Sequence, residues 1–210
     1  MSGDILIRRT PYTLFFKPLL DRVAAFLLFI PLGPILGLLS LLVKLTSKGP
    51  VFFRQRRIGQ HKREFQIYKF RSMYVTAPSE MPTHMLSNAN SHITPIGRFL
   101  RKSSLDELPQ IFNILSGRMS FIGPRPALWN QFDLRDERDR YHANDVKPGI
   151  TGWAQVTGRD ELPIPVKAER DGYYAAHVSL WLDLKILFMT FFNVVRAKGV
   201  VEGAQGEGKK

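Results

Sequence analysis

The feature that most constrains the fold is an apolar run at residues 23–43 that contains no charged side chain. A helix of about 20 apolar residues is long enough to cross the hydrocarbon core of a bilayer. A signal peptide is a poorer interpretation, because Lys44-Leu45-Thr46-Ser47-Lys48 follows the run in place of a small-residue cleavage site. The run therefore predicts a segment inserted in a membrane.

Prolines interrupt this run, and basic residues flank it. Pro31, Gly33 and Pro34 lie in its middle, where prolines remove hydrogen bonds and bend a helix. The two halves would reach roughly 12 Å and roughly 15 Å, about one leaflet each. Because both flanks are rich in Lys and Arg, the positive-inside rule places both on the cytoplasmic face. We therefore expect a re-entrant helix–break–helix; a kinked spanning helix and a buried pair of core helices are the alternatives.

The chain is strongly basic and lacks cysteine. It has 30 Lys and Arg against 18 Asp and Glu, a net charge of +12. That excess predicts an anionic partner: nucleic acid, acidic lipid headgroups or a phosphorylated substrate. No familiar nucleic-acid-binding motif is present, so we expect no nucleic acid partner. The absence of cysteine excludes disulfides and thiolate catalysis, and the five histidines lack the spacing of a zinc site.

The rest of the chain predicts a mostly helical α+β fold. Two β-like runs, residues 51–53 and 65–68, flank a basic polar segment and suggest a small β-hairpin. Residues 75–92 lack periodicity and predict a long mobile loop. The Gly- and Lys-rich tail is expected to be disordered. The expected division is an N-terminal membrane re-entrant segment (1–48), packed on a compact cytoplasmic catalytic domain with interfacial helices (49–200), and a tail (201–210).

Two further segments are expected to be helical. The apolar spacing in residues 105–115 fits a helix, with Ser104 and Glu107 as a capping box. Pro109 would impose a kink or a later start on that helix. The apolar segment 179–196 is either a core helix or a helix lying in the membrane interface.

Two adjacent carboxylates, Asp106 and Glu107, lie among strong cations. The cations are Arg101 and Lys102 on one side and Arg118 and Arg125 on the other. Cations near an aspartate hold it ionised and attract anionic ligands such as phosphates. This segment is the candidate for the chemistry of the chain.

Four ordered blocks carry a resemblance to a known family. They are Gly49-Pro-Val-Phe-Phe-Arg-Gln-x-Arg-x-Gly59 with Lys69-Phe-Arg-Ser-Met73, then Arg101-Lys-Ser-Ser-Leu-Asp-Glu-Leu-Pro-Gln110, then Met119-Ser-Phe-Ile-Gly-Pro-Arg-Pro126, and Lys147-Pro-Gly-Ile-Thr-Gly-Trp-Ala-Gln-Val-Thr-Gly-Arg159 followed by Asp171-Gly-Tyr-Tyr174. Together they resemble the small monotopic phosphoglycosyl transferases, or bacterial sugar transferase family, whose members are undecaprenyl-phosphate sugar-1-phosphate transferases. The resemblance runs from about residue 17 to 196.

The resemblance implies an activity. Members transfer a sugar-1-phosphate from a UDP-sugar to polyprenol phosphate and release UMP, with Mg²⁺ and a phosphoryl-aspartate intermediate. This would be the first membrane step of exopolysaccharide or other glycoconjugate assembly. The implied location is the cytoplasmic face of the bacterial inner membrane, and the implied partners are the UDP-sugar, polyprenol phosphate and membrane lipid. A homodimer is left open, as are the sugar donor and the glycan pathway.

The resemblance also implies the site residues. Asp106 matches the nucleophile and is expected to bind the metal, since a carboxylate attacking phosphorus divides one hard displacement into two easier ones. Glu107 matches its partner, with metal binding, proton transfer and orientation of Asp106 all left open. The expected substrate-binding residues are Lys69, Arg71, Arg101, Arg125 and Arg159. The competing hypothesis is a non-enzymatic membrane scaffold of a glycan assembly complex, which would leave the carboxylate pair among arginines unexplained.

Overall fold

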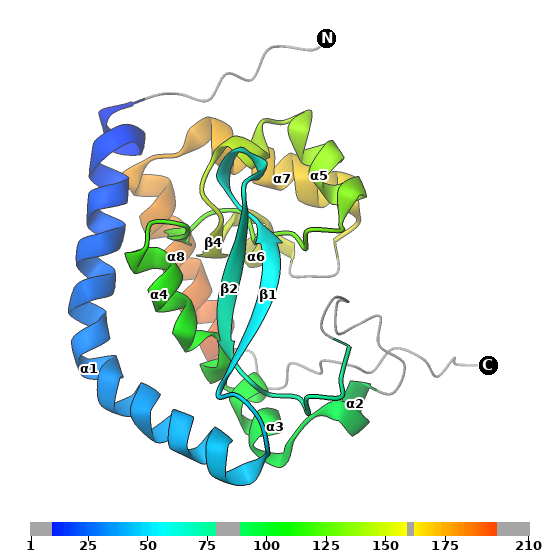
Figure 1. Ribbon diagram of the computed structural model, residues 1–210. Coiled ribbons are helices and arrows are strands. Elements are labelled where there is room, and N and C mark those ends of the chain that lie inside the picture. The colour runs from blue at the N-terminus through cyan, green and yellow to red at the C-terminus, as the bar shows by residue number, and fades with distance from the viewer. Residues whose placement is uncertain (1–9, 79–88, 159–161, 197–210) are drawn as a thin grey trace.

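The longest element is the N-terminal helix α1 (Lys17–Thr46), which follows a π-helical turn, η1 (Tyr12–Phe16). The structure, a computed structural model, describes residues 10–78, 89–158 and 162–196. Pro31 and Pro34 both lie inside α1, which bends in its second half without being interrupted (Figure 1). The expected break between two separate helices is therefore wrong. Residues three apart share a helix face, so the hydrogen bonds that the two prolines remove fall on one side and the other side keeps the helix continuous.

One side of α1 packs on the rest of the protein and the other side does not. Ala25, Leu36, Leu39 and Val43 are buried in a core shared with β2 and α4. Large apolar side chains on the opposite side are exposed, among them Phe26, Ile30, Leu38, Leu41 and Leu45. Soluble monomers rarely expose so extended an apolar surface. By length and composition, the stretch Tyr12–Thr46 is the one helix in the described ranges able to cross a membrane. The predicted apolar helix is confirmed, and its re-entrant path stays a prediction.

The predicted hairpin is confirmed, and its strands are longer than expected. β1 (Phe52–Ile58) pairs antiparallel with β2 (Glu64–Phe70), in a register that sets Phe52 opposite Phe70. The basic segment assigned to the turn belongs largely to β1, where Arg54 and Arg56 face solvent between less exposed neighbours. A short 3-10 turn, η2 (Gln60–Lys62), connects the strands.

The predicted helix at 105–115 is two elements, as Pro109 suggested. Leu105–Gln110 forms a 3-10 helix, η4, and the α-helix α4 (Ile111–Leu115) begins only after it. The predicted capping box is wrong. Ser104 adopts a left-handed backbone (φ 56°) and makes no side-chain cap, while the Glu107 carboxylate points elsewhere.

The side chain of Asn113 attaches α4 to the hairpin. It is fully buried, its Oδ1 accepts from the amide of Tyr68 at 3.0 Å, and its Nδ2 donates to the Gln66 carbonyl at 2.7 Å. The amide thus pairs with the outer edge of β2 as a neighbouring strand would. This contact fixes η4, which immediately precedes α4, against β2.

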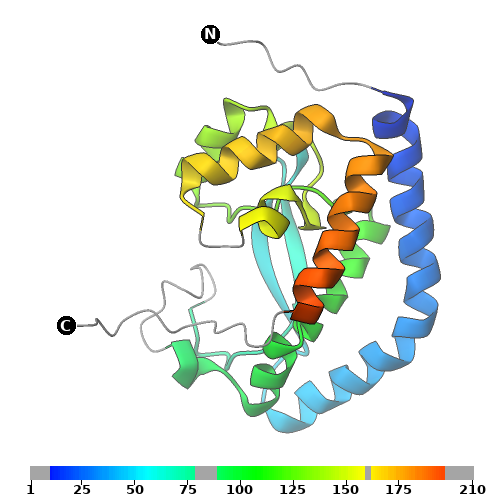
Figure 2. The same cartoon turned by 180° about the vertical axis from the view of Figure 1, so that it is seen from behind.

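The second half of the chain packs behind the hairpin (Figure 2). Within this part of the chain, strand β3 (Ser120–Ile122) pairs in parallel with strand β4 (Gly149–Thr151). The helices are α2 (Ala89–His92), α3 (Pro95–Lys102), α5 (Phe132–Asp139), the 3-10 turn η5 (Ala143–Asp145), α6 (Trp153–Gly158), α7 (Ile164–His177) and α8 (Leu180–Arg196). The mostly helical α+β prediction is confirmed. The tail at 201–210 and most of the predicted loop at 75–92 lie outside the described residues.

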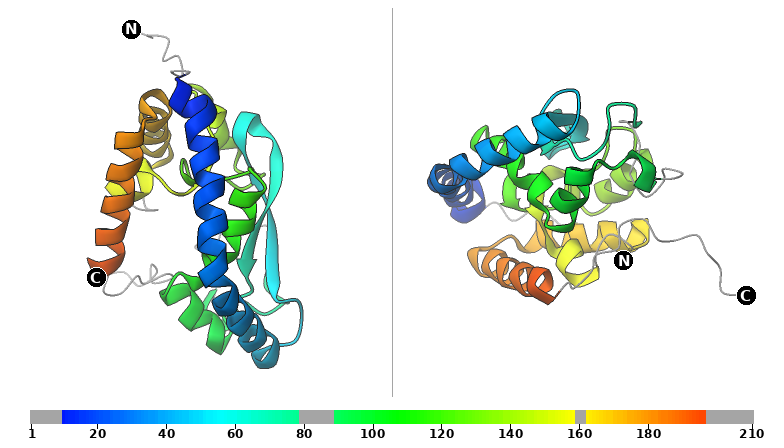
Figure 3. Two further views of the ribbon diagram at one scale, coloured as in Figure 1. Left: turned by 90° about the vertical axis from the view of Figure 1, so that its left-hand side faces the viewer. Right: turned by 90° about the horizontal axis from the view of Figure 1, so that it is seen from below.

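Helix α8 has one buried and one exposed side, so its core role is confirmed. Leu182 and Ile186 are buried, whereas Trp181 is 77% exposed and Phe188 and Phe191 are also exposed. Helices α1 and α8 run along the same side of the molecule (Figures 2 and 3). The membrane-interface role of α8 stays a prediction.

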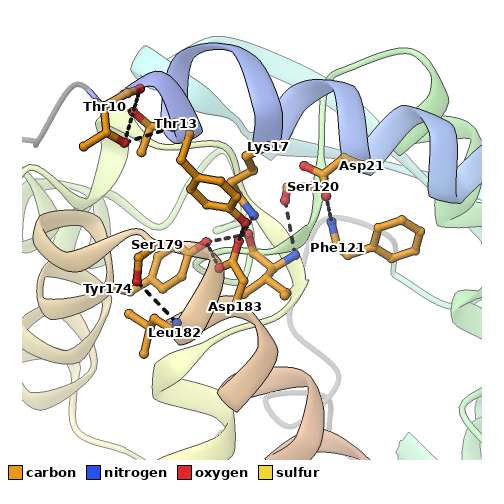
Figure 4. A network of polar contacts seen from close by, with 12 residues as sticks. Thr10, Thr13, Lys17, Asp21, Ser120, Phe121, Tyr174, Ser179, Leu182 and Asp183 are labelled. Atoms are coloured by element: carbon orange, nitrogen blue, oxygen red, sulfur yellow. Dashed lines mark hydrogen bonds and ion pairs between the residues drawn. The ribbon is translucent and has the colours of Figure 1, made fainter.

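A buried carboxylate ties the start of α1 to the start of α8. The Oδ2 atom of Asp183 accepts from Tyr12 Oη and from Lys17 Nζ, each at 2.7 Å, and its Oδ1 accepts from Tyr174 Oη at 2.8 Å (Figure 4). One turn along α1, Asp21 accepts from the Phe121 amide at 3.3 Å. These contacts fix the N-terminal end of α1 on the folded domain.

We expect Asp183→Asn to destabilise the fold by about 3 kcal/mol, because the substitution leaves the Lys17 ammonium buried without its counter-charge. Thermal unfolding in detergent should show a midpoint lower by roughly 6–12 °C. Asp136→Asn is the matched control, because that carboxylate is 70% exposed in its pair with Arg135. A midpoint unchanged in both variants would contradict the structural role given to Asp183.

Candidate functional site

The predicted dyad lies where η4 packs against the end of β2. Asp106 is 8% exposed and forms part of the wall of a pocket of about 690 Å³. The other walls come mainly from the hairpin and the segment that follows it, including the cations Arg54, Arg57 and Lys69. The predicted nucleophile therefore lies at the wall of a cation-lined pocket.

Glu107 binds two of the predicted cations. Its Oε1 atom accepts from Lys69 Nζ at 2.7 Å and from Arg125 Nη2 at 3.3 Å. Burial alone would raise the pKa of this carboxyl, but Lys69 and Arg125 outweigh burial and lower the pKa to about 2. Because the folded-state pKa is depressed, the charged carboxylate contributes its full stability at neutral pH, and that contribution is lost progressively as the pH falls from the ordinary carboxyl pKa toward about 2. The lowered pKa keeps Glu107 charged near neutral pH.

Arg101 lies on helix α3 and lines the same pocket. Thr94 caps the start of the helix, because its side chain accepts from the Gly97 amide at 2.9 Å. A β-carbon at position 97 would collide with the Ser72 carbonyl, so only glycine lets α3 lie directly on the chain after β2. Arg101 and Asp106 are thereby brought into one wall.

Arg71 lines the pocket as well, but its guanidinium also makes structural contacts. It is buried and donates to the Lys48 carbonyl at 2.9 Å and to the Ser47 carbonyl and hydroxyl at 2.7 Å. These acceptors follow the last turn of α1, so Arg71 holds the C-terminal end of that helix on the hairpin. Its contact with substrate stays a prediction. Arg159 lies outside the described residues.

Two kinds of residue escaped the sequence analysis. Arg57 lines the pocket and donates to the Pro126 carbonyl at 2.9 Å. Arg54 lines the pocket too, and neither arginine was predicted there because the segment that contains both was assigned to a turn. The buried pair of Arg138 and Asp171 was also missed, because no local pattern relates residues from two different helices.

The acidic residues near the pocket are few. Across the described ranges, no group of three or more His, Asp or Glu side chains is arranged to hold a metal ion. Mg²⁺ is commonly held by only one or two carboxylates together with substrate phosphates. Asp106 at the pocket wall fits that mode, whereas Glu107 is already occupied by two cations.

Comparison with known proteins identifies relatives over most of the chain. The family model for bacterial sugar transferases matches residues 12–197. The chain is 42% identical over 200 residues to a UDP-glucose:undecaprenyl-phosphate glucose-1-phosphate transferase of Xanthomonas campestris pv. campestris, covering 91% of this chain and 41% of that protein. It is 38% identical over 196 residues to a UDP-N-acetylgalactosamine-undecaprenyl-phosphate N-acetylgalactosaminephosphotransferase of Aeromonas hydrophila, covering 90% and 46%.

A relative of similar length is the uncharacterized sugar transferase EpsL of Bacillus subtilis (strain 168), 40% identical over 184 residues, with 88% of this chain and 89% of that protein covered. The chain thus spans less than half of the two larger relatives and most of the smaller one. Because the family match includes nearly all of the described residues, the protein belongs to the bacterial sugar transferase family.

Proposed function

We propose that this protein transfers a sugar-1-phosphate from a UDP-sugar to a polyprenol phosphate such as undecaprenyl phosphate, releasing UMP. The observation that carries the proposal is Asp106 at the wall of a pocket that Lys69 and Arg101 also line. Such a pocket suits a diphosphate, because the cations offset its repulsion of the attacking carboxylate. The two larger relatives are named for this type of transfer with different sugars, so we assign no sugar.

The proposed reaction has two displacements at one phosphorus. An Asp106 carboxylate oxygen attacks the phosphorus that bears the sugar, and the bond from that phosphorus to the UMP oxygen breaks. A phosphate oxygen of the polyprenol phosphate then attacks the same phosphorus. The bond to Asp106 breaks, the carboxylate is restored, and a polyprenyl diphosphate sugar is formed. Neither displacement requires Glu107 to carry a proton, in keeping with its fixed charge.

We propose Mg²⁺ as the cofactor, held by Asp106 and by donor phosphate oxygens. When bound, the ion would neutralise charge on the transferring phosphoryl group. Glu107 then has a separate role: its carboxylate holds Lys69 and Arg125 beside the pocket.

The location proposed is the cytoplasmic face of the inner membrane. Both ends of α1 are held by one folded domain, through Asp183 near its start and Arg71 at its end. A helix held in this way has both flanks on the same side of a bilayer, which supports the re-entrant path. Helices α1 and α8 lie along one side of the molecule (Figure 3), and each exposes large apolar side chains, which supports contact of both with lipid.

Asp106→Asn should remove the nucleophile and reduce UMP release by at least about 10³-fold. The assay uses purified protein, Mg²⁺, polyprenol phosphate and a panel of UDP-sugars. Without the acceptor, the unsubstituted protein should release about one UMP per chain in a burst, as a covalent intermediate requires. Asp136→Asn serves as the matched exposed control and should keep full activity. Full activity in Asp106→Asn would remove the proposed nucleophile, and no UMP release with any sugar would count against the reaction itself.

Single cysteines placed at both flanks of α1 should react with an impermeant thiol reagent from one side of the membrane. The chain has no cysteine of its own, so Pro11→Cys and Lys48→Cys each give one exposed site. Asp136→Cys reports the side that holds the domain. All three should be labelled in inside-out vesicles and protected in right-side-out vesicles. Labelling of the two flanks from opposite sides would establish a spanning helix instead.

A further inference from the structure

The loop that carries Arg125 is attached to the rest of the domain through a run of carbonyl groups. Pro124 and Pro126 flank Arg125, and prolines have no amide hydrogen to donate. Four consecutive carbonyls, those of residues 124 to 127, accept hydrogen bonds instead. The Pro124 carbonyl accepts from Gly149 N at 3.0 Å and the Arg125 carbonyl from Arg138 Nη2 at 3.0 Å. The Pro126 carbonyl accepts from Arg57 Nη1 at 2.9 Å and the Ala127 carbonyl from Ile58 N at 2.9 Å. Two of these four donors are arginine side chains.

Arg138 makes the bond to the carbonyl of Arg125 itself. Its guanidinium lies on α5 and is nearly inaccessible, with 4% of the side chain exposed. Nε and Nη2 both donate to Oδ2 of Asp171 on α7, at 2.9 Å and 2.6 Å. Nη2 also donates to the Arg125 carbonyl. Asp171 therefore fixes the guanidinium in the orientation that reaches the loop.

We propose that Arg138, oriented by Asp171, is a positioning residue that sets the place of Arg125 in the site. The inference rests on the proposed function, and it assigns a role to two residues outside the pocket. From the Arg125 carbonyl the path continues through the residue's own side chain to Glu107, whose other partner is Lys69. Helices α5 and α7 are thereby connected to the cations beside Asp106.

Two energetic arguments favour a role of the Arg138–Asp171 pair in positioning Arg125. A shift of about 1 Å in a group that orients substrate can cost about 10²-fold in rate. A buried ion pair adds little net stability relative to well-packed apolar residues of similar size, so stability alone does not account for this one. Burial raises the pKa of Asp171 and the Arg138 guanidinium opposes that rise. Replacing Arg138 alone would therefore leave the buried Asp171 carboxylate without its counter-charge, so Arg138 and Asp171 must be changed together.

The test is the double variant Arg138→Met with Asp171→Leu, which fills the space without charge but cannot donate to the Arg125 carbonyl. We expect its thermal midpoint to stay within about 5 °C of the unsubstituted protein, with kcat for UMP release lower by about 10–100-fold. The same substitutions in the ion pair at the C-terminal end of α5, Arg140→Met with Glu137→Leu, are the matched control and should leave kcat unchanged; the Arg140 side chain is 72% exposed. If the double variant does not fold, Arg138→Lys is the alternative. It keeps a positive charge beside Asp171 but cannot donate to both Asp171 and the Arg125 carbonyl as the guanidinium does, and it should show the same loss of kcat.

A double-mutant cycle with Arg125→Ala separates placement from general support. If Arg138 acts through Arg125, the double variant should lower kcat by less than about 3-fold in the Arg125→Ala background. The same 10–100-fold loss in both backgrounds would overturn the proposal, as would full activity of the folded double variant.

Hydrogen exchange of the peptide spanning residues 119–131 provides a readout that does not need turnover. Exchange in this peptide should be faster in the double variant than in the control. If no UDP-sugar releases UMP from the unsubstituted protein, the reaction assignment fails on its own. Unchanged exchange would then overturn the positioning role separately.

Discussion

The arrangement of the site depends on one carboxylate shared by two cations. Oε1 of Glu107 binds Lys69 from β2 and Arg125 from the loop after β3, while Glu107 itself belongs to η4. Three segments that are distant in sequence therefore meet at one oxygen atom. The Glu107 carboxylate offsets the repulsion between Lys69 and Arg125, and these two cations in turn hold the pKa of Glu107 low. Asp106, the adjacent residue, is left at the pocket wall among cations whose positions are already fixed.

A second constraint is that α1 is part of the domain's core rather than a separate anchor. Its buried residues Ala25 and Val43 belong to the same core as Phe65 and Ile67 of β2, and α4 contacts both elements. The buried contacts of Asp183 near its start and of Arg71 at its end add polar fixation. The element with the most lipid-like surface thus shares a core with the strand that presents Lys69. This shared core joins the proposed place of the acceptor, in the bilayer, to the proposed place of the chemistry.

The sequence predicted those features that local pattern determines. An uncharged run specifies an apolar helix, two β-like runs at residues 51–53 and 65–68 indicate a hairpin, and Pro109 delays an α-helix to Ile111. Prediction from the sequence failed where a local pattern competes with a contact to a residue far away in the chain. Ser104 and Glu107 have the spacing of a capping box, but two cations bind the Glu107 carboxylate and Ser104 turns left-handed. Arg71 matched a binding motif, although its structural partners lie more than twenty residues earlier. The Arg138–Asp171 pair had no local signature, since only the packing of α5 on α7 brings it together.

Asn113 has a consequence for how the chain can assemble. An exposed strand edge is a template on which another chain can add a strand. The Asn113 amide occupies the Tyr68 amide and the Gln66 carbonyl at the middle of the free edge of β2. A second copy could extend the sheet there only by breaking both bonds and displacing a fully buried side chain. The β2 edge of the hairpin is therefore protected against strand addition by one side chain of the same chain.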